Sequence, residues 1–178
     1  SYNAAELRVF LSLVGEEQPP DDIHDWIGKN IFNNKIDRAA IKKKVFSWLY
    51  NPKAKNIKLS KLFNKESLIN KFYRDGCVYT PYNRRIEATD HYALNYILQS
   101  TTSDMFLSSA IDVHSFLKNK KSFISFCVHD SLVIDLAIED KDAISQIIEI
   151  FSNTGLGKFR VNANLGKDYG NMKKLRRQ

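Results

Sequence analysis

The chain has 178 residues, of which 43% are hydrophobic and 12% aromatic, so it can bury a core and is not a disordered chain. Its formal net charge of +7 favours a polyanionic partner such as nucleic acid, although many basic domains bind none. No apolar run approaches the roughly 18 residues of a membrane-spanning helix, and no signal peptide is recognisable, so we expect no membrane partner. Two distant cysteines, Cys77 and Cys127, argue against a disulfide framework or a zinc site; Cys127, within an apolar run, is predicted to be buried.

The first predicted elements are two helices joined by a polar loop. Residues 4–14 favour a helix, because small and apolar side chains recur at helical spacing. Residues 15–22, GEEQPPDD, predict a loop, since a glycine, two prolines and four acids leave little to pack. Asp21 or Asp22 can then cap a helix that begins near Ile23.

The strongest helix signal covers residues 38–50. Asp37 is a good N-cap for this helix, and the Asn-Pro pair at 51–52 ends it. Its inward side is predicted to carry four apolar residues: Ile41, Val45, Trp48 and Leu49. A second helical stretch is predicted over residues 57–74.

A stripe of larger side chains lies beside that inward side. Arg38, Lys42, Phe46 and Tyr50 recur at every fourth residue and therefore form one slowly rotating row. Taken alone, the row is interpreted as a solvated basic face with two half-buried aromatic side chains. Only other motifs in the chain can change that interpretation.

The middle of the chain predicts a hairpin followed by a helix. Residues 77–86, CVYTPYNRRI, alternate in polarity and contain the turn residues Pro81 and Asn83. Residues 87–99 have helical character. The expected inward positions of this helix are Ala88, Tyr92 and Ile97.

A polar break, QSTTSD over residues 99–104, is predicted to end that helix. Ser103 or Asp104 can then cap a new helix over residues 104–118. The side chains expected to be buried there are Phe106, Leu107, Ala110, Val113 and Leu117.

The last third predicts a second hairpin, a helix and a strand. Residues 123–137 hold two apolar runs around the polar triplet His-Asp-Ser at 129–131, which places one carboxylate at a hairpin tip. Asp140 or Asp142 starts a helix, and residues 158–166 alternate like a strand. Helices and antiparallel strands without a regular βαβ rhythm imply an α+β fold.

Taken in order, these pieces resemble the polymerase region of family A DNA polymerases, the bacterial polymerase I type. The resemblance covers nearly the whole chain and rests on motifs in the family's order. The motifs are SYNAAELR (1–8) for D-Y-S-x-x-E-L-R, DIH (22–24) for the short motif before the nucleotide-binding helix, the Arg38-x3-Lys42-x3-Phe46-x3-Tyr50 spacing for that helix, GCVYTPYNRR (76–85) for G-x-V-x-T-x-x-G-R-R, NYILQSTTSD (95–104) for N-x-P-x-Q-G-T-A-A-D, and VHDS (128–131) for V-H-D-E. The NAAELR and FSWLYNP segments also resemble phage branches of the family.

The resemblance implies a particular division of the chain. Residues 1–22 and 77–178 correspond to the palm, an antiparallel sheet with helices, and residues 23–76 to a small helical fingers subdomain. Residues 1–178 would thus be a C-terminal polymerase region without thumb or exonuclease domains. We expect a longer polymerase whose N-terminal part is a partner, in the cytoplasm of a bacterial or phage-infected cell.

The resemblance also implies template-directed transfer of a nucleotidyl group from a dNTP to a primer 3′ hydroxyl, in DNA replication or repair. Such a transfer uses two Mg²⁺ ions held mainly by carboxylates. Asp130 is the expected catalytic metal ligand, although it can instead simply shape the turn. The family's other carboxylate stands where this chain has Ser1, a poor replacement, so we expect weak metal binding and poor turnover.

The fingers stripe gains a role from the resemblance. Arg38 and Lys42 are expected to meet the β and γ phosphates of the incoming nucleotide, with Lys42 counted as catalytic. Phe46 would pack against the sugar, and Tyr50 would lie near the templating base. His24 is expected to add a phosphate contact, or else it is an ordinary structural histidine.

Glu6 resembles the family's steric gate, which disfavours a ribose 2′ hydroxyl; otherwise it is a surface partner for a basic side chain. Primer-template DNA is the second expected ligand. Its predicted contacts are Asn95 and Gln99 at the minor-groove edge, His129 at the primer-terminal phosphate, and Arg84 and Arg85 at backbone phosphates.

Three alternatives stay open. Ser1 favours a non-catalytic DNA- or nucleotide-binding remnant that lacks the first metal-binding Asp. The triplet at 129–131 is similar to the single-subunit RNA polymerase branch, although Phe46 argues against it because that branch usually has methionine there. An unrelated basic α+β domain is the third.

Overall fold

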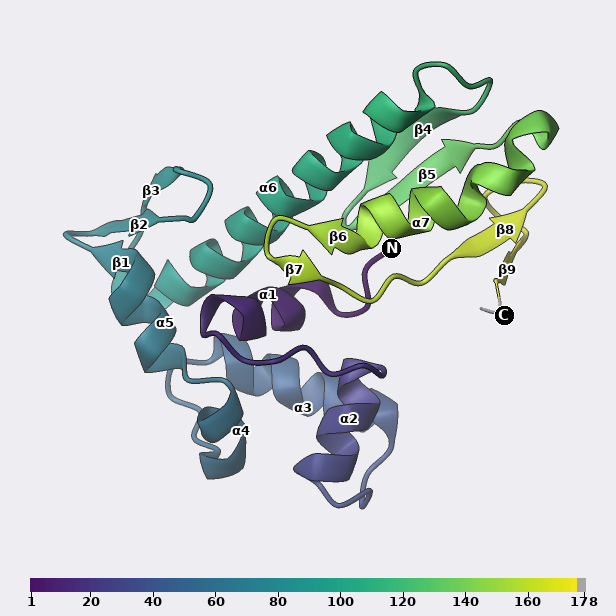
Figure 1. The fold of residues 1–178 in the computed structure, drawn as a ribbon. Helices are drawn as coiled ribbons and strands as arrows, with labels where there is room; N and C mark the ends of the chain where they lie inside the picture. Colours follow the sequence, from purple (N-terminus) through teal and green to yellow (C-terminus); the bar gives the residue numbers. More distant parts are fainter. Residues whose placement is uncertain (176–178) are drawn as a thin grey trace. The chain divides into compact units, whose positions relative to one another are not determined.

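The computed structural model describes residues 1–175 and contains two compact units (Figure 1). Unit 1 consists of residues 1–3 and the chain from Met105 onward, and unit 2 consists of residues 4–104. Each is described by itself. The predicted palm and fingers have other bounds and stay a prediction. None of the helices within residues 1–175 has the length and apolarity that crossing a membrane requires.

Five helices begin unit 2, and two of them start at predicted caps. The helices are α1 (Ala5–Leu13), α2 (Ile23–Asn30), α3 (Arg38–Tyr50), α4 (Ile57–Leu62) and α5 (Lys65–Phe72). Asp22 and Asp37 accept hydrogen bonds from the first backbone N–H groups of α2 and α3, as predicted. The expected helical stretch over 57–74 is two helices, because Asn64 caps α5 and separates it from α4.

A small antiparallel sheet follows in unit 2, in the order β1 (Tyr73–Arg74), β2 (Cys77–Tyr79) and β3 (Arg85–Glu87). Asp75 and Gly76 form the first turn with φ of 51° and 70°, and Asn83 in the second turn has a φ of 60°. Asparagine, aspartate and glycine tolerate this left-handed backbone better than other residues. The predicted hairpin over 77–86 is therefore confirmed.

The predicted break at 99–104 is wrong, because α6 (Asp90–Leu117) is continuous through it. Thr101 and Thr102 are buried, and the Ser100 hydroxyl donates to the Tyr96 carbonyl one turn earlier. Ser100 satisfies its hydroxyl on the helix in this way. The buried hydroxyls of Thr101 and Thr102 have no hydrogen-bond partner within residues 1–175, so it is the packing of these side chains against the core that accompanies the continuous helix. Asp104 is not a cap, since its carboxylate binds Arg84 instead.

Two predicted inward positions on α6 are also wrong. Tyr92 is 52% exposed and Leu107 is exposed as well. The buried face is set by Ala93, Ile97 and the positions that follow at helical spacing, so Tyr92 lies about 100° away from it. The other expected inward residues of the second half are buried: Phe106, Ala110, Val113 and Leu117.

Unit 1 contains short paired strands together with α7 (Ile144–Ser152) and the second half of α6. Its elements after α6 are β4 (Phe123–Val128), β5 (Ser131–Asp135), the 3-10 helix η1 (Ile138–Ala143), α7 (Ile144–Ser152), β6 (Asn153–Thr154), β7 (Gly157–Lys158), β8 (Asn164–Gly166) and β9 (Met172–Lys174). The strands pair antiparallel as β4–β5, β6–β7 and β8–β9. The helix expected from Asp140 or Asp142 begins later, because the Asp140 carboxylate accepts from Ser122 rather than capping α7.

The predicted strand over 158–166 is interrupted between β7 and β8, and Val161 there forms an isolated bridge with Tyr2. The Tyr2 ring stacks on Phe151 at 4.3 Å between centroids, and its hydroxyl donates to the Phe151 carbonyl at 2.7 Å. This contact fixes the first residues of the chain within unit 1. Helices with small antiparallel sheets confirm the predicted α+β class.

Cys127 is exposed, which contradicts the prediction of a buried thiol. It lies on β4, which pairs only with β5 among the described strands. Phe123 and Phe126 on the same strand are exposed too. The apolar run therefore reflects strand propensity and not burial on both faces.

Candidate functional site

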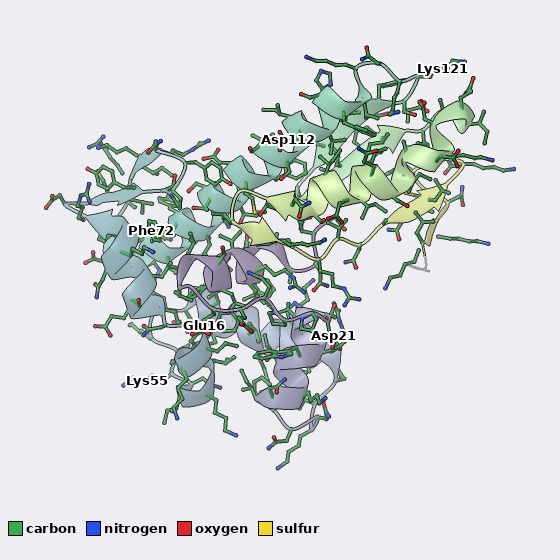
Figure 2. All side chains as sticks on the ribbon, viewed as in Figure 1. Glu16, Asp21, Lys55, Phe72, Asp112 and Lys121 are labelled. Atoms are coloured by element: carbon green, nitrogen blue, oxygen red, sulfur yellow. The ribbon has the colours of Figure 1, made fainter. Side chains whose placement is uncertain are left out.

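One carboxylate joins the beginnings of α2 and α3, which lie beside each other in unit 2 (Figure 1). Oδ1 of Asp22 accepts from the backbone N–H groups of His24 and Asp25 at 3.0 and 3.2 Å. The same oxygen accepts from Arg38 Nε at 3.0 Å, and Oδ2 accepts from Arg38 Nη2 at 2.6 Å. Figure 2 marks the neighbouring Asp21 at the end of the acidic loop that leads into α2. Asp22 therefore caps one helix and holds the first side chain of the next.

The charge state of this cluster follows from its surroundings. The hydrogen bonds that Arg38 donates to the Asp22 carboxylate raise the pKa of the guanidinium above its usual value. His24 is only 2% exposed, and desolvation lowers the pKa of its imidazole to about 4. Its Nδ1 has no hydrogen-bond partner within residues 1–175. His24 is thus a neutral, buried ring near neutral pH.

The aromatic members of the stripe lie along α3 as the spacing predicted. The ring centroids of Phe46 and Tyr50 are 6.1 Å apart with an interplanar angle of 23°, and the His24 ring lies 6.0 Å from Phe46. The Tyr50 hydroxyl donates to the Glu6 carboxylate. Burial, together with this hydrogen bond, raises the pKa of Tyr50. Lys42, on the same helix, is exposed.

Unit 2 also contains a cavity of about 280 Å³ next to the end of α3. Tyr50, His91 and Asn95 line it with Lys65, whose amino group donates to the Trp48 carbonyl at 2.6 Å. Desolvation lowers the pKa of that amino group. The structure thus places Asn95 and Tyr50 at one cavity, whereas Gln99 lies on the exposed side of α6.

The two predicted DNA-contacting arginines have acidic neighbours. Arg84 binds Asp104 through two hydrogen bonds, Nε to Oδ2 at 3.0 Å and Nη2 to Oδ1 at 2.5 Å. Nη2 of Arg85 lies 3.7 Å from the Glu87 carboxylate, and both side chains of this ion pair are exposed. Both guanidinium groups are about half exposed, so a stronger anion can reach them.

The hairpin tip in unit 1 holds the remaining predicted residues. His129 forms the turn between β4 and β5 with a φ of 52°, and Asp130 follows it half-buried. Burial lowers the pKa of the Ser1 amino group, and the nearby Asp130 carboxylate opposes that shift. Ser1 and Ser131 line the same cavity of about 250 Å³. Ser1 and the Asp130 carboxylate therefore lie near each other in unit 1.

The donor set at this tip does not fit a pair of magnesium ions. Asp130 is the one acidic side chain of the triplet, and Ser1 offers a neutral hydroxyl. No group of three or more histidine, cysteine, aspartate or glutamate side chains gathers anywhere in residues 1–175. A pair of metal ions requires several carboxylate oxygens, so the residues present do not supply that site.

Sequence reasoning missed three residues that hold the candidate site together. Asp22 was predicted only as a cap, and its bond to Arg38 spans 16 residues of chain. Asp104 was predicted as a cap and instead binds Arg84. Lys65 had no predicted role, yet its ammonium lies 4.2 Å from the Trp48 ring centroid. The sequence contained a signal for one of the three, because Asp22 is the acidic residue of the DIH motif. It contained no such signal for Asp104 or Lys65.

Comparisons with known proteins agree with the predicted resemblance. No protein-family model matches the chain. Over 88 residues it is 30% identical to "DNA polymerase I" of Borreliella burgdorferi, which covers 47% of this chain and 10% of that relative. The fold is similar to a structure described as "POL domain of Pol1 from M. smegmatis complex with DNA primer-template and dNTP", with a TM-score of 0.67, 18% identity, and coverage of 85% of this chain and 35% of the other.

These comparisons confirm the resemblance to polymerases of the polymerase I type and the fold of a polymerase domain. The chain spans about a tenth of the length of the curated relative it matches. The similarity to a phage branch is not tested by them and stays a prediction.

Proposed function

We propose that this chain is the palm-and-fingers part of a template-directed DNA polymerase that binds primer-template DNA and a dNTP. The supporting observation is the cluster on α1, α2 and α3, where Tyr50 bonds to Glu6 and the Phe46 ring lies beside the rings of Tyr50 and His24. The Arg38 charge acts on the pKa of His24 from the first turn of α3. The fold similarity to a polymerase domain in complex with DNA and dNTP supports the same assignment.

In this proposal α3 recognises the nucleotide. Arg38 and Lys42 bind the phosphates, since a guanidinium can contact two oxygens at once and an ammonium adds a point charge. His24 contributes a neutral ring beside them. Phe46 packs against the sugar, and Tyr50 lies near the templating base.

Glu6 is the proposed gate against ribonucleotides. Its carboxylate accepts from the Tyr50 hydroxyl, which orients it. A fixed carboxylate beside the sugar leaves no room for a 2′ hydroxyl, so a dNTP is preferred. This role favours a DNA polymerase over a single-subunit RNA polymerase relative.

The DNA contacts are proposed on polar side chains outside α3, which are exposed except for the half-buried Asn95. Asn95 and Gln99 read the minor-groove edge near the primer end, where acceptors are similar for all base pairs. Arg84 and Arg85 exchange their carboxylate neighbours for backbone phosphates, and His129 contacts the primer-terminal phosphate.

The chemical step is nucleotidyl transfer to a primer 3′ hydroxyl, in replication or repair. Bound magnesium ions would activate that hydroxyl and stabilise the leaving pyrophosphate. Asp130 is the proposed metal ligand of this chain, but the residues present do not hold two ions. This chain's own contribution is therefore to bind and orient the nucleotide and the DNA.

A second candidate function is a non-catalytic nucleotide- or DNA-binding relative. The observation that favours it is Ser1 beside Asp130, at the position where the family has its first metal-binding carboxylate. The polymerase proposal requires that carboxylate from another source. Because the matched structure's chain is longer, we propose that other polymerase segments are partners in the cytoplasm of a bacterial or phage-infected cell.

Nucleotide binding by α3 is the direct test. We expect Arg38→Ala and Lys42→Ala each to weaken dNTP binding about tenfold, measured by isothermal titration calorimetry on the full chain. Lys43→Ala is the matched control, because Lys43 is exposed on the same helix but lies outside the stripe. Equal affinities for all three variants and the unmodified chain would overturn the proposed binding surface.

A further inference from the structure

We propose that Asp22 is an internal competitor of the incoming triphosphate: its carboxylate occupies the phosphate-binding fork of Arg38 until nucleotide phosphates displace it. The inference rests on the proposed role of Arg38 in nucleotide binding and adds a residue that tunes it. Asp22 would set how tightly a triphosphate is held and would distinguish a triphosphate from weaker anions.

The geometry gives Arg38 one face for both ligands. Nε and Nη2 of the guanidinium donate to the two oxygens of Asp22 at 3.0 and 2.6 Å. A phosphate group binds the same pair of donors with the same fork geometry. A carboxylate and a phosphate therefore cannot both occupy this face, and binding of one requires release of the other.

The helix cap keeps Asp22 in place whether or not Arg38 is bound. Oδ1 accepts from the N–H groups of His24 and Asp25 at the first turn of α2. These bonds fix the carboxylate without help from Arg38. Release of Arg38 therefore leaves the competitor next to the site, ready to rebind when the nucleotide leaves.

The exchange is feasible because the pair is accessible from one side. The Arg38 side chain is 48% exposed, while the Asp22 side chain is 18% exposed. Arg38 can thus turn toward solvent, whereas Asp22 stays anchored. Partly exposed ion pairs are weak, so the competition should lower triphosphate affinity by about three- to tenfold and not abolish it.

The test compares two charge-neutralising substitutions on the same helical turn. Asp22→Asn keeps a cap oxygen for α2, since asparagine is an equally good N-cap, but loses the charge that holds Arg38. Asp25→Asn removes the same charge nearby, where the carboxylate lies 3.9 Å from Arg38 Nε and forms no fork. The probes are a dNTP and inorganic tripolyphosphate, titrated into the full chain by calorimetry.

We expect Asp22→Asn to tighten binding of both probes about three- to tenfold and Asp25→Asn to tighten it less than twofold. In an Arg38→Ala background, Asp22→Asn should give no gain, which shows that the effect passes through Arg38. Thermal unfolding of both asparagine variants checks that α2 is intact.

Each outcome decides between the two proposals. Unchanged or weaker binding in Asp22→Asn, with a folded protein and a loss in Arg38→Ala, would overturn the competitor role and leave nucleotide binding standing. Equal gains in both asparagine variants would show a general charge effect and would also overturn it. If no variant binds either probe, nucleotide binding by α3 is itself wrong, and the inference falls with it.

Discussion

The cluster at α2 and α3 in unit 2 and the tip of the β4–β5 hairpin in unit 1 contain the residues proposed for nucleotide binding and for metal binding, and the two sets differ in completeness. At α2 and α3, each proposed nucleotide contact except Lys42 has a defined neighbour: Asp22 for Arg38, Phe46 for His24, and Glu6 for Tyr50. At the hairpin tip, Asp130 has Ser1 where a second carboxylate would be needed. Under the proposed function, nucleotide binding can therefore be tested separately from catalysis, because the proposed nucleotide contacts all lie in the first region.

The largest expected effect comes from adding a second carboxylate at the tip of the β4–β5 hairpin. Ser1→Asp adds the second carboxylate beside Asp130, and metal ions contribute several kcal/mol to transition-state stabilisation. We expect magnesium-dependent primer extension to rise about 10³-fold, equivalent to about 4 kcal/mol. Ser1→Asn, which has the same shape without the charge, should give no gain. Full activity of the unmodified chain would contradict the comparison.

The buried guanidinium of Arg8 holds the loop that leads into α2, so the position of the α2–α3 cluster should depend on it. Arg8 is 1% exposed, and its guanidinium donates to the carbonyls of Pro19 and Asp21 at 2.9 and 2.7 Å. Arg8→Met removes the donor that binds these two carbonyls and releases the loop that leads into α2. We expect a loss of about 3 kcal/mol in unfolding free energy, measured by urea denaturation, and a loss of dNTP affinity.

The control for that prediction is Lys43→Met, which removes an exposed cation from the same unit and should change the unfolding free energy by less than about 0.5 kcal/mol. A fully stable Arg8→Met variant would show that the α2 start is held by other contacts.

We expect the unfolding free energy to depend on pH because His24, in the α2–α3 region, is buried as a neutral ring. Burial lowers its pKa from the ordinary 6.5 to about 4 in the folded chain, so the unfolded chain binds more protons between those values. The contribution of the neutral ring is therefore fully present above pH 6.5 and is lost as the pH falls toward 4. At pH 5 the loss should be about 2 kcal/mol relative to pH 7.

The measurement is the unfolding free energy of the unmodified chain minus that of His24→Gln, at pH 7 and at pH 5. The variant removes this titration, so the difference between the two proteins should shrink by about 2 kcal/mol at the lower pH. A difference that does not change with pH would mean that His24 is solvated and not part of a packed cluster.

The sequence predicted what depends on neighbours along the chain. Asp22 and Asp37 were recognised as caps because a cap bonds to N–H groups two or three residues away. The hairpin turns at Asn83 and at 129–131 were recognised for the same reason. The motif spacing on α3 predicted its aromatic row correctly, because helical periodicity is local.

Predictions failed where distant contacts decide the outcome. The hydroxyl residues at 99–104 suggested a break, yet burial of Thr101 and Thr102 keeps α6 helical. Cys127 lies in an apolar run but on an exposed strand, which only the pairing of β4 reveals. The Asp22–Arg38 fork was missed because it depends on how two helices meet, and no periodicity encodes that.

The smallest expected effect comes from removing the hydrogen bond between Tyr50 and Glu6, for which the hairpin tip has no counterpart within residues 1–175. Tyr50→Phe removes the hydroxyl that holds the Glu6 carboxylate, so the proposed sugar gate loses its orientation but keeps its charge. We expect the ratio of dNTP to rNTP affinity to fall about fivefold, equivalent to about 1 kcal/mol, which is the usual worth of one hydrogen bond.

Tyr73→Phe is the matched control, since that hydroxyl donates to the Ala88 carbonyl at 3.0 Å and not to Glu6. Glu6→Ala should lower the ratio further than Tyr50→Phe. If neither Tyr50→Phe nor Glu6→Ala changes the ratio, Glu6 is an ordinary hydrogen-bond partner of Tyr50, and the choice of sugar is made elsewhere.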